Sequence, residues 1–131
     1  MAAHDHLGSQ WDDFFSSKPD SAPAEAIHQW ATPLDWDRRE HPDVADFWEE
    51  KTDEASMRGM DDSIQQHGVV NPVRMYDVGL LRDGHHRIAA AMKVNPQADV
   101  PIFWINNPDE QPEYKEKGPD GRWLPDVNNG F

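Results

Sequence analysis

A strand-like stretch that runs through a glycine directly into an alanine-rich helix constrains this chain more than any other feature. Residues 80–92 have the sequence LLRDGHHRIAAAM. The first residues are apolar, Asp83 and Gly84 predict a bend, and Ala89–Ala91 favour a helix. Glycine adopts backbone torsions that other residues avoid, so Gly84 can join the two elements without a longer loop. The small alanines would let the helix pack closely against a sheet.

The apolar periodicity predicts further elements on both sides of this joint. In chain order they are a helix at 42–51, a helix at 56–67, a hairpin of strands at 73–77 and 80–82, a helix at 85–94 and a strand at 100–105. Met57, Met60 and Ile64 would form the buried stripe of the second helix, and Gly68 would end it with a left-handed residue. These elements predict an α+β domain with a mixed sheet and packed helices.

The two ends of the chain are expected to be irregular extensions of one small domain at residues 43–105. Residues 1–42 are acidic and rich in Pro and Trp, and four prolines, Pro33 among them, would cut helical fragments near 11–16 and 23–30 short. Residues 106–131 return to Pro, Gly, Asn and charge, and we expect them to pack on the domain through Trp123 and Leu124.

Composition excludes several classes of function. The chain has no cysteine, which removes disulfides, thiolate metal sites and cysteine nucleophiles. It has no apolar run as long as a signal peptide or a membrane span, so we expect a soluble, cytoplasmic protein without membrane contact. The net charge is −13, and residues 1–57 carry fourteen acidic and four basic side chains. Such a surface disfavours non-specific DNA binding. Residues 58–104 carry five of each sign and could hold a local positive pocket.

The joint at Gly84 has the chemistry of an anion site. The first backbone N–H groups of a helix lack partners within the helix, and the helix dipole makes them attractive to phosphate. Asp83 is placed to cap the helix, and Arg87 lies in its first turn, where a guanidinium could grip phosphate. Many such joints carry a glycine and a capping aspartate with no ligand at all, so the local pattern leaves both readings open. His85 and His86 face different directions on a helix, which disfavours a metal pair, and no metal site is predicted.

Residues 62–105 resemble the ParB/sulfiredoxin-like family, also described as the ParB-like nuclease domain. Two motifs carry the resemblance. The first is SIQQHGVVNPV, from Ser63 to Val73, and the second is GHHRIAA, which matches the Gly-x-x-Arg-x-x-Ala phosphate motif of that family. The resemblance covers about a third of the chain. It implies a nucleoside triphosphate, CTP or ATP with Mg²⁺, as the ligand.

The resemblance also implies roles for individual residues. The predicted nucleotide-binding residues are Gly68, Pro72, Gly84, His85, His86 and Arg87. Asp83 and His86 are the predicted catalytic residues, with Asp83 placing a metal ion or the acceptor and His86 donating a hydrogen bond to phosphate. The general base stays open among Glu49, Glu50, Asp61 and Asp62, which are merely near the first motif.

Members of this family differ in activity, so three hypotheses follow. The first is a nucleotide-dependent enzyme, an NTPase, kinase or nuclease. Without a cysteine the chain cannot carry out sulfiredoxin chemistry with a thiol of its own, and Asp83–Arg87 matches the Asp-Gly-His-x-Arg form of small-molecule kinases more closely than the form of the DNA clamps. The second is a DNA-binding or DNA-processing protein, which the acidic charge disfavours. The third is a phage or plasmid adaptor that binds a host protein through its acidic N-terminal half, with Trp11, Trp30, Trp36 and Trp48 either as interface anchors or, more often for such residues, in the core.

Overall fold

The computed structural model describes residues 9–39, 44–77, 79–107, 109–119, 121 and 124. Within these residues the chain forms a four-stranded mixed sheet and five helices. In chain order the elements are α1 (Ser9–Ser16), β1 (Ser21–Pro23), α2 (Ala24–Arg39), α3 (Val44–Met57), α4 (Met60–His67), β2 (Val73–Met75), β3 (Leu81–Asp83), α5 (His85–Val94) and β4 (Asp99–Trp104). The α+β class with a mixed sheet that the sequence predicted is therefore confirmed.

The strands lie in the order β1-β4-β2-β3. The predicted hairpin is present: β2 and β3 pair antiparallel, with a register shift next to Arg74. The chain then passes through α5 and returns as β4, which pairs parallel with β2 so that Val73 lies opposite Ile102. On its other side β4 pairs antiparallel with β1, and Ser21 lies opposite Pro101.

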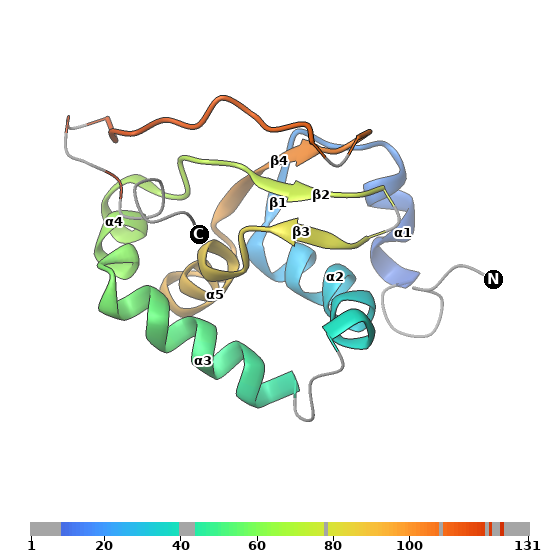
Figure 1. Cartoon of the computed structure of the whole chain (residues 1–131), viewed down its shortest axis with the longest axis horizontal. Coiled ribbons are helices and arrows are strands. Elements are labelled where there is room, and N and C mark those ends of the chain that lie inside the picture. The colour runs from blue at the N-terminus through green and yellow to red at the C-terminus, as the bar shows by residue number, and fades with distance from the viewer. Residues whose placement is uncertain are drawn as a thin grey trace.

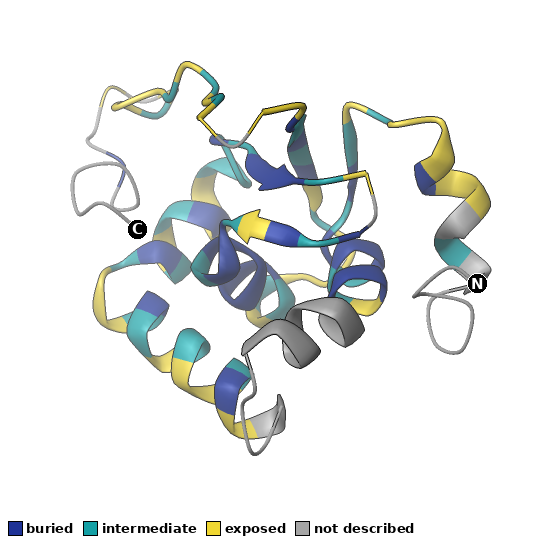
Figure 2. Cartoon of the chain, turned by 45° about the vertical axis from the view of Figure 1, so that its right-hand side comes forward, coloured by how far each residue is buried: buried dark blue, intermediate teal, exposed yellow. Residues whose placement is uncertain are grey.

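Helix α5 is the central helix of the fold. It packs between the sheet and α3, and it also contacts α2 and α4 (Figure 1). Its inner residues Ile88, Ala90 and Ala91 are completely buried. Alanine at these positions keeps the helix thin on the sides that face its neighbours, as the sequence predicted. The burial pattern of the fold is visible in Figure 2, where β2 and most of α5 are dark blue and α3 carries exposed residues, drawn in yellow, along its length.

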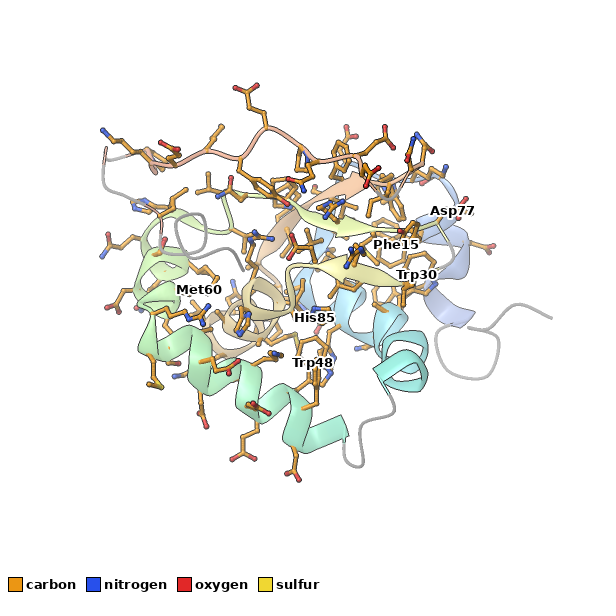
Figure 3. The ribbon with its side chains drawn as sticks, viewed as in Figure 1. Phe15, Trp30, Trp48, Met60, Asp77 and His85 are labelled. Atoms are coloured by element: carbon orange, nitrogen blue, oxygen red, sulfur yellow. The ribbon has the colours of Figure 1, made fainter. Side chains whose placement is uncertain are left out.

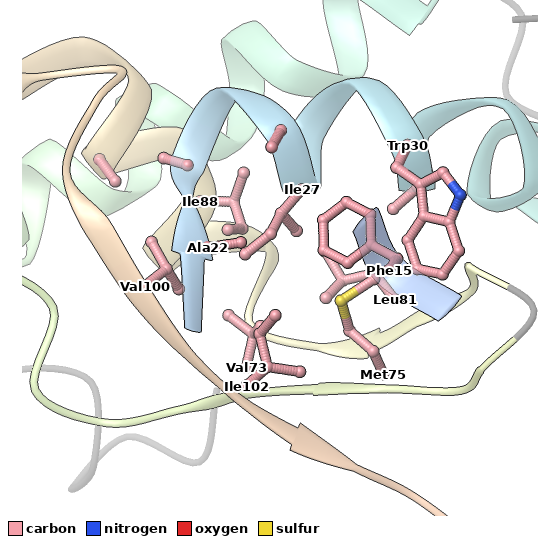
Figure 4. Packing of buried hydrophobic residues seen from close by; sticks show 14 residues of the cluster. Phe15, Ala22, Ile27, Trp30, Val73, Met75, Leu81, Ile88, Val100 and Ile102 are labelled. Atoms are coloured by element: carbon pink, nitrogen blue, oxygen red, sulfur yellow. The ribbon is translucent and has the colours of Figure 1, made fainter. Parts of the chain in front are cut away.

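The core draws heavily on the N-terminal part of the chain. Phe15 and Trp30 stack with their ring centroids 4.3 Å apart and pack beside Met75 and Leu81 (Figure 4). The second half of this core is made of aliphatic side chains, Ala22, Ile27, Val73, Ile88, Val100 and Ile102. Burying a side chain such as Phe15 stabilises a fold by about 1.5–3 kcal/mol. Residues 9–39 are thus a structural part of the domain, and the prediction of an irregular extension is wrong for them.

Other expectations for the first half of the chain also need correction. Helix α2 continues through Pro33 to Arg39, although a proline inside a helix removes one hydrogen bond and was expected to end it. Its first turns are anchored in the core by Ile27 and Trp30, so packing outweighs the local cost. Trp30 is buried and therefore cannot act as an interface anchor, and Trp11 and Trp48 pack against the core. The side chain of Trp36 lies outside the described residues.

The helices around Gly59 differ slightly from the prediction. Helix α3 runs on to Met57, and α4 begins only at Met60 after a turn at Arg58 and Gly59. The turn leaves the side chain of Met57 86% exposed, so Met57 is not part of the buried stripe that Met60 and Ile64 form.

A segment after β4, residues 109–119, follows an irregular path beyond the sheet, and we call it the C-terminal strap (Figure 1). The side chain of Asn71 binds it at one residue by two hydrogen bonds. Asn71 Nδ2 donates to the carbonyl oxygen of Lys115 at 3.0 Å, and the amide of Lys115 donates to Asn71 Oδ1 at 2.7 Å. Arg74, whose side chain points away from the core side of β2, donates to the carbonyl oxygen of Glu110. Leu124 is buried, whereas Trp123 lies outside the described residues.

Candidate functional site

The strand-to-helix joint forms as the sequence predicted. β3 ends at Asp83, Gly84 adopts a left-handed conformation with φ of 111°, and α5 begins at His85. A side chain at Gly84 would also collide with the core, because a Cβ there would lie 2.5 Å from Cγ1 of Val73. The glycine is therefore required by backbone conformation and by packing. The N-cap residue is Gly84 itself, so the prediction that Asp83 caps the helix is wrong.

A hollow of about 180 Å³ opens at the N-terminus of α5. Lys51, Arg82, Asp83, Gly84, His86 and Arg87 line most of it. Three of these side chains carry positive charge and one carries negative charge. The N-terminus of α5, where the amide of Ile88 donates to the carbonyl of Gly84, lies at this hollow. A chain with a net charge of −13 thus has a locally basic hollow.

Arg87 lines the hollow but is 3% exposed and is held by the protein itself. Its Nη1 donates to the carbonyl oxygen of Pro72 at 3.1 Å, and its guanidinium lies over the ring of Tyr114, 5.4 Å from the centroid. At least one N–H group of the Arg87 guanidinium is therefore used within the protein, where it holds Pro72, the residue before β2. The exposed cation at the hollow is Arg82, with Lys51 beside it.

Asp83, the carboxylate of the hollow, is linked to the C-terminal strap. The hydroxyl of Tyr114 donates to Asp83 Oδ2 at 3.3 Å. Burial, together with the negative charge of Asp83, raises the pKa of Tyr114, so the phenol stays protonated and remains a donor at neutral pH. Tyr114 therefore contacts both Asp83 and Arg87, and it connects the strap to the joint.

The two adjacent histidines have different surroundings. His85 is buried against the aromatic rings of α3, with its ring centroid 5.7 Å from Phe47 and 6.0 Å from Trp48 (Figure 3). His86 faces α3 at a more polar position, and its Nε2 lies 2.7 Å from Oε1 of Glu54. The structure thus gives His85 a packing environment and His86 a polar partner.

The first motif lies on the other side of Arg87. Gly68 lines a separate cavity of about 20 Å³ together with Ser63, Asn71, Arg87 and Leu124. A cavity of this size has room for about one water molecule and none for a nucleobase. Pro72 contributes its carbonyl oxygen to Arg87. The structure therefore brings Asp83, Gly84, His85, His86 and Arg87 together at one hollow, whereas Gly68 and Pro72 do not line it.

Sequence reasoning missed Lys51, Glu54, Arg82 and Tyr114. Arg82 adjoins Asp83 in the chain and could have been found by extending the motif by one residue. Lys51 and Glu54 reach the joint because α3 packs along α5, and Tyr114 does so because Asn71 fixes the strap. Neither arrangement has a local sequence signal.

The four candidates for a general base do not line the hollow. Glu49, Glu50 and Asp62 are exposed on α3 and α4. Asp61 pairs with Lys93 at 2.7 Å and accepts a hydrogen bond from Ser56.

The side chains around the hollow could bind Mg²⁺ only together with phosphate groups that also bind the ion. Within the described residues no group of three His, Asp or Glu side chains could hold a metal ion. Mg²⁺ at nucleotide sites is commonly bound by one or two carboxylates and by the phosphates themselves, and Asp83 provides one carboxylate. No helix in the described part of the chain is long and apolar enough to cross a membrane.

Comparisons of the chain with models of protein families, with curated proteins and with solved structures found no significant match.

Proposed function

We propose that the protein binds the phosphate groups of a nucleoside triphosphate in the basic hollow at the N-terminus of α5. The observation that carries the proposal is the gathering of Lys51, Arg82 and Arg87 around the first turn of a helix, in a chain that is otherwise strongly acidic. Phosphate is favoured at such a helix terminus by the N–H donors and by the dipole. The hollow is much larger than a single water site, so a phosphate group can enter.

The resemblance to the ParB/sulfiredoxin-like family supports the choice of a nucleotide over a smaller anion. CTP and ATP are the ligands that it favours, and Mg²⁺ would arrive on the phosphates with Asp83 as its protein carboxylate. Arg82 and Lys51 would provide the direct charge contacts, while Arg87 holds the joint in shape through Pro72 and Tyr114. The acidic exterior disfavours the alternative of general DNA binding.

Thermal unfolding in the presence of ATP, CTP or GTP with Mg²⁺ tests the proposal. A ligand at a hundred times its dissociation constant stabilises the fold by ~2.7 kcal/mol, which corresponds to roughly 10 °C for a domain of this size. Arg82→Ala should abolish most of this gain, because the side chain is exposed and its removal leaves the core intact.

Lys18→Ala is the matched control. It removes the same charge at an exposed side chain that pairs with Asp77 and does not line the hollow. This variant should keep the full nucleotide response. The proposal fails if none of the nucleotides nor inorganic triphosphate raises the melting temperature of the unaltered protein. It also fails if Arg82→Ala and Lys18→Ala respond equally.

A further inference from the structure

Glu54 and His86 form a paired carboxylate and imidazole at the edge of the hollow. Glu54 lies near the end of α3, and His86 is the second residue of α5. Their Oε1 and Nε2 atoms are 2.7 Å apart, and the His86 side chain is only 15% exposed. His86 lines the hollow, and Lys51, also at the hollow, lies 3.6 Å from the same oxygen of Glu54.

The surroundings fix the charge of both partners. Burial lowers the pKa of His86, and the nearby charges of Lys51 and Arg58 lower it further, while Glu54 acts in the opposite direction. The net effect is a neutral imidazole at neutral pH. The hydrogen bond from His86 lowers the pKa of Glu54, with help from Lys51, so Glu54 is ionised.

These charges also fix which nitrogen of His86 can take up a proton. An ionised carboxylate can only accept a hydrogen bond, so the Nε2 atom that faces Glu54 carries the hydrogen. In a neutral imidazole the other nitrogen, Nδ1, is then the basic atom. A carboxylate that holds one imidazole nitrogen in this way fixes the tautomer and the ring orientation, and it stabilises the imidazolium that forms on proton uptake.

We propose that His86 is the general base of a nucleoside triphosphate hydrolysis in the hollow and that Glu54 is its positioning residue. The inference rests on the proposed function, because it requires a triphosphate bound at the N-terminus of α5. His86 removes a proton from a water molecule, and the water oxygen forms a bond to the terminal phosphorus. The bond between that phosphorus and the bridging oxygen breaks, so that a nucleoside diphosphate and inorganic phosphate are released, and His86 returns the proton to solvent.

The other polar groups at the hollow are less suited to this role. Asp83 already accepts a hydrogen bond from the hydroxyl of Tyr114. His85 is buried, and its ring contacts the aromatic rings of Phe47 and Trp48. Lys51 and Arg82 are cations that can neutralise phosphate.

Two measurements on the same full-length variants test this inference. Thermal shift with ATP or CTP and Mg²⁺ reports binding, and single-turnover release of phosphate between pH 5 and 9 reports chemistry. His86→Asn should keep the thermal shift and lose ~10²–10⁴-fold in rate, the usual contribution of a general base. Glu54→Gln should slow release at least ~10-fold by the same reasoning. It should also move the acidic limb of the rate profile to lower pH, because Glu54 raises the pKa of His86.

Glu50→Gln, an identical change at an exposed position of the same helix, should leave the rate and its pH profile unaltered. If His86→Asn does not fold, Glu54→Gln still decides the matter, since a merely structural glutamate would not shift the acidic limb. The inference is overturned if the unaltered protein binds nucleotide and releases no phosphate, or if Glu54→Gln has the profile of the unaltered protein. Absence of any thermal shift overturns the proposed function itself, and this inference with it.

Discussion

Gly84→Ala should destabilise the protein more than the same change at Gly59, Gly68, Gly118 or Gly121. Two costs combine at this position. A residue with a Cβ pays about 1–2 kcal/mol to adopt a left-handed conformation. In addition, the new Cβ would lie 2.5 Å from Cγ1 and 2.9 Å from Cβ of Val73, which is fully buried, and such overpacking costs about 1–3 kcal/mol. The expected loss is therefore about 2–5 kcal/mol, a large share of the ~5–15 kcal/mol typical of a domain.

Gly59→Ala separates the two costs. Gly59 also has a positive φ, 83°, but nothing lies within 4 Å of the position of its added Cβ. This variant should pay only the backbone cost of about 1–2 kcal/mol. Urea unfolding followed by tryptophan fluorescence measures both variants. The double variant Gly84→Ala/Val73→Ala should lose less free energy of unfolding than the two single variants lose together, because alanine at position 73 removes the closest clash. Equal losses for Gly84→Ala and Gly59→Ala would refute the reasoning about the tight packing of the joint.

Three further predictions concern the rest of the fold. Asn71→Ala removes both hydrogen bonds to Lys115 from a buried position, so it should cost about 1–3 kcal/mol and speed hydrogen exchange and proteolysis in the C-terminal strap. Phe15→Ala should lower the free energy of unfolding by about 3–5 kcal/mol in urea denaturation, and a loss below about 1 kcal/mol would show that residues 9–39 are peripheral. Burial lowers the pKa of both His28 and His86, so the unfolded chain binds more protons. The free energy of unfolding should therefore keep its full value above 6.5, the pKa of a histidine in the unfolded chain, and fall as the pH drops below it. His86→Gln should flatten this slope in melting curves from pH 8 to 5.

Local patterns in the sequence predicted the second half of the fold well. The hairpin, the helix at 85–94 and the strand that follows depend on alternation, helix-forming alanines and a glycine, and all of these act over a few residues. The same reasoning failed for residues 9–39, where many prolines and polar residues suggested irregular structure. There the decisive interactions are between distant residues, such as Phe15 with Trp30 and β1 with β4.

The candidate site, too, was predicted only in the part that depends on neighbouring residues of the chain. The joint itself and the closeness of Asp83, Gly84, His86 and Arg87 could be predicted, because these residues are neighbours in the chain. The helix packing that brings Lys51 and Glu54 to the hollow, and the strap that brings Tyr114, depend on tertiary contacts. The hydrogen bond from Arg87 to the carbonyl oxygen of Pro72 could not be predicted either. An arginine and a proline at these positions would also be expected if Arg87 bound phosphate.

The pairing of Ser21 with Pro101 has a consequence for how this protein is made. β1 has its sheet partner in β4, the last of the described strands, so a nascent chain leaving the ribosome carries β1 and the aromatic rings around it until β4 emerges. Contacts between such distant segments must wait for closure of a long loop, which slows folding relative to local structure. During that interval Phe15 and Trp30 lack the sheet that covers them. The order of synthesis therefore leaves the N-terminal segment as the part of this chain most in need of protection against aggregation until residue 104 is in place.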